Sequence, residues 1–231
     1  MKRFFENVNV VTIDGGFAIA LDEHLLKTPA KKTLFCPTQK LAQRVGEEWQ
    51  QQGDTIKPDL MPVMRLVATA LDRVQHTQAE TAKAFAAYGL SDLLCYRATH
   101  PEKLVKRQEA TWTPLLGWAK ARFGLSLVVT SGIVPAPQPA NTQSRLIDSV
   151  GDDIFRLTGL AFGAPLLGSA ILALALAESE INVQTAYEAS QLDDIFQMEE
   201  WGRDAEITER LAHRHSEILA LGRYFAALAD R

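Results

Sequence analysis

The feature that most limits the fold is an uncharged apolar run from Thr158 to Ala177, TGLAFGAPLLGSAILALALA. An unbroken helix of this length could cross a bilayer. The run is interrupted, however, because Phe162-Gly163-Ala164-Pro165 is typical of a turn into a new helix with proline at its first position. About 13 apolar residues then remain, and a segment of that length is more often a buried core helix. We therefore expect a buried central helix and no stable membrane insertion.

The bulk composition fits a folded globular protein. The chain has 231 residues, of which 47% are hydrophobic and 23% charged, so it can bury one large core or two unequal ones. Its formal net charge of -4 argues against a general nucleic-acid binder, which needs a basic surface to displace counterions from phosphates. Cys36 and Cys95 lack metal-ligand spacing, which favours a reducing compartment.

The N-terminal part predicts a small antiparallel sheet. Val8 to Ile13 is rich in β-branched residues, Asp14-Gly15-Gly16 can turn, and Phe17 to Leu21 can pair back as a hairpin. Leu25 to Lys27 and Leu34 to Cys36 are further strand candidates.

Helical periodicity begins at Thr38, a suitable N-cap for a helix that ends near Gly53. Further helices are expected over residues 62–74, 79–88, 101–110, 113–123, 145–162, 183–201 and 207–228. Leu125 to Thr130 is strand-like, and either rejoins the N-terminal sheet or caps the helical body. The predicted fold class is α+β, with a small β-containing N-terminal domain over residues 1–58 and a mainly α-helical domain over 59–231.

Motifs for catalysis are scarce. His213 and His215 are two positions apart on an expected helix, so their side chains point in nearly opposite directions and cannot share a metal. The chain has no G-x-S-x-G, Walker, G-x-G-x-x-G or H-E-x-x-H motif. We expect no cofactor. Asp92, Tyr96 and Arg97 could support acid-base chemistry, because Asp92 and Tyr96 would meet on one helical face. An internal structural contact is the simpler interpretation.

An unusual pattern lies between Leu192 and Gly202, LDDIFQMEEWG. On one helical wheel over residues 183–201, large apolar side chains cover more than half of the circumference, and Glu188, Asp194 and Glu199 fall inside that apolar arc. A buried carboxylate without a partner costs several kcal/mol. Either an internal arginine satisfies these groups, or an exposed aromatic and acidic surface docks a basic partner.

In this segment the chain resembles the assembly chaperones that bind the alpha subunit of the catalytic sector of F-type ATP synthase. That family is found in mitochondria and alphaproteobacteria. LDDIFQMEEWG followed by Asp204, Glu206 and Arg210 is similar to its C-terminal signature. Other pieces match in order: Leu26-Lys27-Thr28-Pro29, Glu48-Trp49, Met61-Pro62, Arg65-Leu66, Ala70-Leu71-Asp72-Arg73, Asp92 to Ala98, Gln108, Trp112, Pro114-Leu115 and Trp118. The chain departs from the family at the turn Asp22-Glu23-His24, where relatives commonly carry Asp-Gly-Arg, at Thr113, where Asp is common, and at Asp194, where Glu is common.

The resemblance implies a chaperone without enzymatic activity that holds the unassembled alpha subunit until the beta subunit replaces it. It places the protein in a bacterial cytoplasm, or in the mitochondrial matrix of a eukaryote. We expect partner binding at Asp194, Phe196, Met198, Glu199, Glu200 and Trp201. The alternatives are a small enzyme that uses Asp92, Tyr96 and Arg97, and a membrane-associated factor that uses the apolar run.

Overall fold

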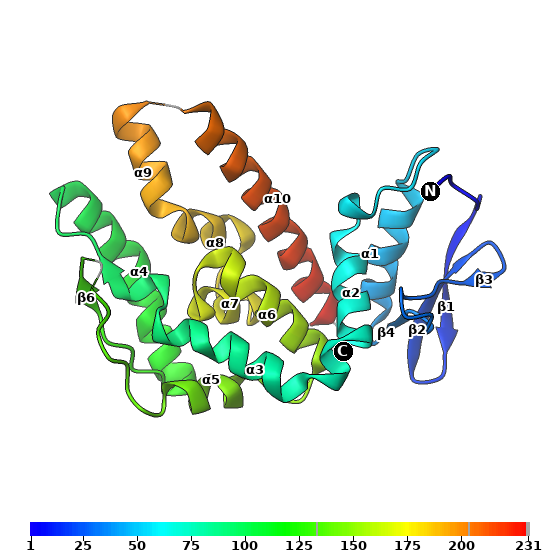
Figure 1. Cartoon of the computed structure of the whole chain (residues 1–231), viewed down its shortest axis with the longest axis horizontal. Helices are drawn as coiled ribbons and strands as arrows, with labels where there is room; N and C mark the ends of the chain where they lie inside the picture. The colour runs from blue at the N-terminus through cyan, green and yellow to red at the C-terminus, as the bar shows by residue number, and fades with distance from the viewer. Residues whose placement is uncertain (133, 203, 230–231) are drawn as a thin grey trace. The chain divides into compact units, whose positions relative to one another are not determined.

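The structure is a computed structural model that describes residues 1–132, 134–202 and 204–229. The chain divides into two compact units (Figure 1). The first contains residues 1–78, 153–159 and the C-terminal residues from Ala220, and the second contains residues 79–152 and 160–219. An antiparallel N-terminal sheet followed by mainly helical structure confirms the predicted α+β class. The predicted domain boundary after residue 58 lies inside the first unit.

The sheet of the first unit is built on the expected hairpin. β1 (Val8–Ile13) pairs antiparallel with β2 (Gly16–Leu21) in a register that joins Val8 to Leu21 and Ile13 to Gly16. Gly15 takes the left-handed φ of 75° in the turn, a conformation that glycine adopts without steric cost. Two short strands, β3 (His24–Leu25) and β4 (Phe35–Cys36), also pair with β2.

Two helices accompany this sheet, α1 (Gln39–Gln50) and α2 (Pro62–Asp72). Thr38 caps α1 as predicted, because its hydroxyl accepts a hydrogen bond from the backbone of Leu41. The Glu48 carboxylate accepts from the amides of Val63 and Met64, both at 2.8 Å. A carboxylate at the N-terminus of α2 satisfies free amides and complements the helix dipole.

Two other segments that carry the family resemblance, around Thr28 and Asp72, also contact each other. The Thr28 hydroxyl donates to Asp72 at 2.7 Å, and the Ala30 amide donates to the other oxygen of that carboxylate at 3.0 Å. The C-terminal residues join the first unit through the Thr38 hydroxyl, which donates to the Ala227 carbonyl at 2.6 Å. Many residues that carry the family resemblance therefore hold the fold together.

The second unit is dominated by helices. Its elements are α3 (Gln78–Ala87), β5 (Tyr96–Arg97), α4 (Glu102–Phe123), β6 (Thr130–Ser131), α5 (Thr142–Val150), most of α6 (Ile154–Leu167), α7 (Ala170–Ala177), α8 (Val183–Ser190), α9 (Leu192–Trp201) and the larger part of α10 (Ala205–Leu228). α7 packs against α4 and α8, and its residues from Ala170 to Ala175 are fully buried. The predicted buried central helix is therefore confirmed. Within the described residues, no helix combines the length and apolarity that crossing a bilayer requires.

The predicted turn at residues 162–165 is wrong. α6 continues through Pro165 and ends at Leu167, and Gly168, with φ of 68°, separates it from α7. A left-handed glycine followed by Ser169, whose hydroxyl accepts from the Leu172 amide, is a stronger stop and start signal than a proline in a last turn. The single helix expected over 145–162 is likewise two helices, α5 and α6, separated by Gly151 with φ of 72°.

One further expectation needs correction, and the fold decides the placement of the strand-like segment, which the sequence left open. Residues 101–110 and 113–123 form one helix, α4, which runs through Pro114. Gln108, Trp112, Leu115 and Ala119 are its buried residues and form a single stripe, so tertiary packing outweighs the proline penalty. The strand-like segment from Leu125 does not join the N-terminal sheet. Only β6 is a strand there, and it pairs in parallel with β5 inside the second unit.

Candidate partner-binding surface

The segment Leu192 to Gly202 forms its own short helix. α9 begins at Leu192 and ends at Trp201, where Gly202 takes φ of 96°. Gln191, with φ of -110° and ψ of 19°, separates it from α8. The single helical wheel over residues 183–201 is therefore wrong, and the Tyr187 side of α8 does not continue along α9.

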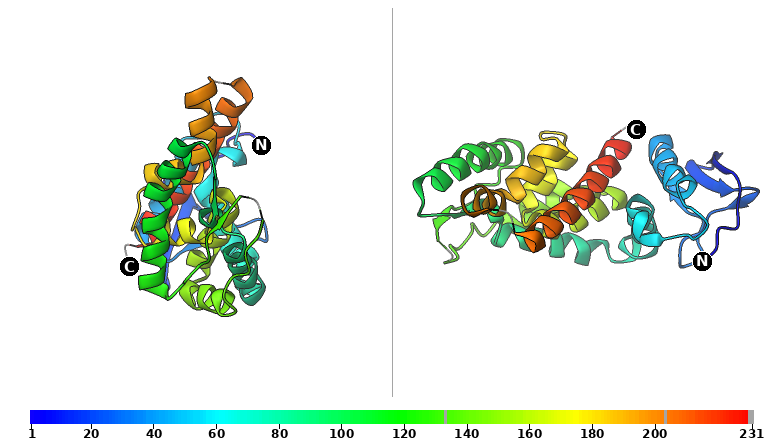
Figure 2. Two further views of the ribbon diagram at one scale, coloured as in Figure 1. Left: turned by 90° about the vertical axis from the view of Figure 1, so that its left-hand side faces the viewer. Right: turned by 90° about the horizontal axis from the view of Figure 1, so that it is seen from above.

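One face of α9 is anchored in the second unit. Leu192 and Phe196 are only 2% and 4% exposed. Asp193 accepts a hydrogen bond of 2.7 Å from the side-chain amide of Gln108 on α4. In Figure 1 and Figure 2, α9 lies between α4 and the first turns of α10. Phe196, one of the predicted partner-binding residues, is therefore buried and anchors α9 in the second unit.

The predicted carboxylates all meet basic groups of the same chain. Asp194 accepts from Arg210 of α10 at 2.8 Å. Glu199 accepts from both terminal nitrogens of Arg107 on α4. Glu200 lies 3.3 Å from the ammonium of Lys103, also on α4. Internal arginines thus satisfy Asp194 and Glu199, which is one of the two alternatives left open by the sequence. Glu188, the other carboxylate of the apolar arc, accepts from Gln184 within α8.

These ion pairs remain in contact with solvent. The side-chain exposures are 53% for Glu199, 41% for Glu200 and 32% for Asp194, and their basic partners are 38% to 77% exposed. Exposed ion pairs of this kind typically contribute about 0 to 1 kcal/mol, because solvent screens them and ordering two long side chains costs entropy. The carboxylates can therefore exchange an internal partner for an external one at little cost in stability.

An exposed aromatic residue follows Glu199 and Glu200 at the C-terminal end of α9. Trp201, the last residue of α9, is 75% exposed, and Met198 is half-buried one turn earlier. Large exposed aromatic side chains are over-represented among the residues that dominate binding energies. The α9 surface is defined here as Asp194, Met198, Glu199, Glu200 and Trp201.

Sequence reasoning did not foresee how α4 supports this surface. Gln108, which is 1% exposed, donates to Asp193 and accepts from the Ala98 amide at 2.8 Å. The indole nitrogen of Trp112 donates to the Ala189 carbonyl at 2.9 Å, near the end of α8. In the sequence, Gln108 and Trp112 were noted only as part of the family resemblance, and the fold supplies their partners.

The alternative acid-base site has a different geometry from the expected one. Leu93–Cys95 is a 3₁₀ turn followed by β5, so Asp92 and Tyr96 do not share a helical face. Asp92 is fully buried and accepts from the amides of Leu94 and Ile171, both at 3.1 Å. Burial raises the pKa of Asp92 to about 6. Arg97 donates to the carbonyls of Leu94 and Gln108, so both groups support the backbone.

Comparison with known proteins places this geometry in a family. The model of the ATP12 chaperone protein family matches residues 2–120. The crystal structure of Atp12 from Paracoccus denitrificans is 37% identical, with 98% of this chain and 97% of that chain covered and a TM-score of 0.91. The chain belongs to the ATP12 chaperone family.

Two further relatives support this membership. The crystal structure of the Atu1473 protein from Agrobacterium tumefaciens is 37% identical to this ATP12-family chain, covers 98% of it and 86% of its own length, and has a TM-score of 0.92. The mitochondrial protein atp12 of Schizosaccharomyces pombe is 22% identical over 214 residues, which cover 87% of this chain and 74% of that protein. The family predicted from the sequence, and with it a chaperone function in ATP synthase assembly, is confirmed.

Proposed function

We propose that this chain binds the unassembled alpha subunit of F-type ATP synthase through the α9 surface. It holds the alpha subunit until the beta subunit replaces the chaperone. Membership of the ATP12 family supports a chaperone. The observation that carries the binding site is a highly exposed Trp201 beside carboxylates whose internal ion pairs are solvent-exposed. An aromatic anchor with adjacent exchangeable charges suits binding that must later be reversed.

The physical need for such a chaperone follows from subunit arrangement. Alpha and beta subunits alternate in the catalytic ring, so a free alpha subunit exposes large interfaces. Interfaces of stable assemblies are extensive and apolar, and an uncovered one promotes aggregation. In our proposal, Trp201 and Met198 contact an apolar part of that surface, while Glu199, Glu200 and Asp194 receive basic groups of the alpha subunit.

The internal arginines have a defined role in this proposal. Arg107 and Arg210 hold Glu199 and Asp194 in place on the free chaperone. Fixing a side chain before binding lowers the entropy lost when the complex forms. Basic groups of the alpha subunit then join or replace these arginines.

The proposal includes no catalytic step and no cofactor. Asp92 is fully buried, so it cannot reach a substrate. The compartment that we propose is the one in which the alpha subunit folds, a bacterial cytoplasm or, in a eukaryote, the mitochondrial matrix.

Co-expression with the cognate alpha subunit tests the function. We expect the chaperone to co-purify with alpha and to keep it soluble, and Glu199→Lys or Asp194→Lys to lose the complex while keeping helical content. Glu178→Lys is the matched control, because Glu178 also forms an exposed ion pair, with Arg122 at 3.3 Å, outside α9. Wild-type chaperone that neither binds alpha nor keeps it soluble contradicts the proposal.

A charge exchange separates binding from internal support. The double variant Arg107→Glu, Glu199→Arg restores an ion pair between α4 and α9 but reverses the charge that α9 presents. If Glu199 contacts alpha, the double variant regains stability and still fails to bind. Recovery of both stability and binding would show that the pair acts only within the chaperone.

A further inference from the structure

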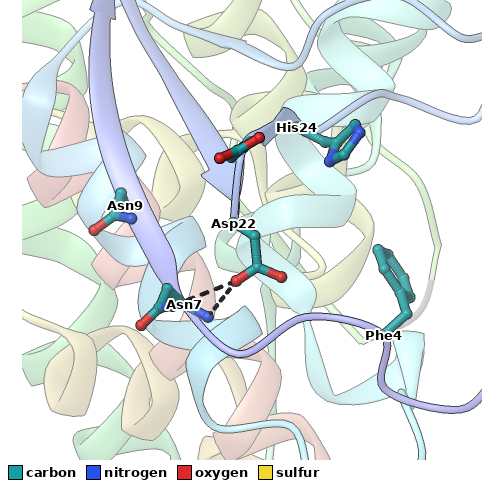
Figure 3. A pocket seen from close by; sticks show the side chains of 6 residues that line it. Phe4, Asn7, Asn9, Asp22 and His24 are labelled. Atoms are coloured by element: carbon teal, nitrogen blue, oxygen red, sulfur yellow. Dashed lines mark hydrogen bonds between the residues drawn. The ribbon is translucent and has the colours of Figure 1, made fainter.

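β1 is an edge strand of the N-terminal sheet. β2 pairs with three strands, whereas β1 pairs with β2 alone among the strands of the described residues. The Asp22 amide donates to the Asn7 carbonyl at 2.9 Å, at the end of β1 where Figure 3 shows the side chains of Asn7 and Asp22 hydrogen-bonded. In an antiparallel pair, the backbone N–H and C=O groups of successive residues point alternately toward the partner strand and away from it. The odd-numbered residues of β1 therefore bond to β2.

The even-numbered residues of β1 consequently direct their backbone outward. Among the described residues, the backbone groups of Val8, Val10 and Thr12 have no hydrogen-bond partner. The strand VNVVTI carries five β-branched residues, no charge and no proline. Folded proteins usually protect an edge with charges, proline or a bulge, because an unprotected edge recruits another strand. This edge lacks those devices.

The ends of β1 indicate which kind of strand fits. Glu6 and Asp14 flank it, and both are exposed. If two copies of this chain paired antiparallel about Val10, Glu6 of each copy would lie opposite Asp14 of the other. Like charges directly opposite each other destabilise a strand pair. A strand with basic residues at its ends would instead meet opposite charge at both positions.

The turn after β2 adds to this negative character. Asp22 and Glu23 line an open pocket together with Phe4, Asn7, Asn9 and His24 (Figure 3). Asp22 accepts from the Asn7 and Glu6 amides, and these hydrogen bonds lower the pKa of its carboxyl.

We propose that the outer edge of β1 accepts an extended segment of the client subunit as an added strand. The segment has basic residues at both ends, and the outward groups of Val8, Val10 and Thr12 supply the backbone hydrogen bonds. This inference rests on the proposed function, because the client is the alpha subunit. It adds a second contact, in the first unit, that does not depend on α9.

Hydrogen exchange on the complex tests the edge directly. In the free chain, the amides of Val8, Val10 and Thr12 should exchange rapidly, because they face solvent. In the complex with the alpha subunit they should become protected. A complex in which these amides exchange as rapidly as in the free chain overturns the inference and leaves the proposed function standing. Failure of any complex to form overturns both.

Two kinds of variant complete the test. Thr12→Pro removes one outward amide without removing a bond to β2, and Thr12→Ala, which keeps that amide, is its control. We expect about tenfold weaker alpha binding for the proline variant, the loss of roughly one hydrogen bond, and little change for alanine. The double variant Glu6→Lys, Asp14→Lys leaves the strand itself intact and should also weaken binding, most at low salt.

Equal affinities for Thr12→Pro and Thr12→Ala, together with unchanged binding by the lysine double variant, contradict the inference. Protection of the same amides in the chaperone alone, rising with its concentration, would identify a second copy as the occupant and would also contradict it.

Discussion

Acidic residues of the second unit lie in two different environments. Asp92 is fully buried and satisfies backbone amides at the start of α7. Glu199 and Asp194 on α9 are partly exposed and pair with arginine side chains. A buried carboxylate that serves backbone groups has no substitute, whereas solvent can replace either member of an exposed pair.

The contrast extends to the tryptophans. Trp112 is fully buried and donates to the Ala189 carbonyl, whereas Trp201 is 75% exposed. The buried residues of the second unit therefore stabilise the fold, and the end of α9 is available for binding.

The largest expected effect is that of Asp92→Ala. This change leaves the amides of Leu94 and Ile171 buried without an acceptor, and we expect it to lower the free energy of unfolding by about 3 kcal/mol. Asp194→Ala, the counterpart on α9, should cost less than about 1 kcal/mol. Urea unfolding of both variants measures the difference. Similar losses of unfolding free energy for the two variants would show that Asp92 and Asp194 contribute equally to the fold.

A smaller effect concerns pH. Burial raises the pKa of Asp92 to about 6 from its usual 3.8, so the folded state binds this proton more tightly than the unfolded state. Its contribution to stability is then full below pH 3.8 and is lost as the pH rises through about 6. Relative to Asp92→Asn, which cannot titrate, wild type should lose about 2 kcal/mol between pH 4 and pH 7. Urea unfolding at each pH measures this difference. If the free energies of unfolding of wild type and Asp92→Asn change with pH in the same way, the raised pKa of Asp92 is contradicted.

The sequence predicted the elements whose signals are local. The hairpin of β1 and β2, the cap at Thr38 and the buried α7 required only turn residues, a hydroxyl and an apolar run. Helix ends were harder to predict. Residues 101–110 and 113–123 were expected as separate helices and Pro165 as the start of a new one, yet Pro114 and Pro165 both lie inside longer helices. Glycines with positive φ mark the true ends of α5, α6 and α9.

The candidate site was only partly predictable. Sequence pattern drew attention to the carboxylates of α9, but the partner of each lies 16 to 97 residues away in the chain. Arg107 and Lys103 occupy ordinary helical positions with no local sign of their role, and Arg210 stood out only through the family resemblance. Which basic residue meets which carboxylate depends on how α4, α9 and α10 pack, and a helical wheel of one segment contains no such information.

The smallest effects compare the two tryptophans. Trp112→Phe keeps an aromatic ring but leaves the Ala189 carbonyl without its indole donor, so we expect a loss of about 1 kcal/mol in the free energy of unfolding. Trp201→Phe should change stability by less than about 0.5 kcal/mol, because the side chain is mostly in solvent. Its effect should instead appear in affinity for the alpha subunit, measured by titration calorimetry, since a smaller ring covers less apolar surface. Destabilisation by Trp201→Phe with unchanged affinity would assign this residue to the fold and remove the aromatic anchor from the α9 surface.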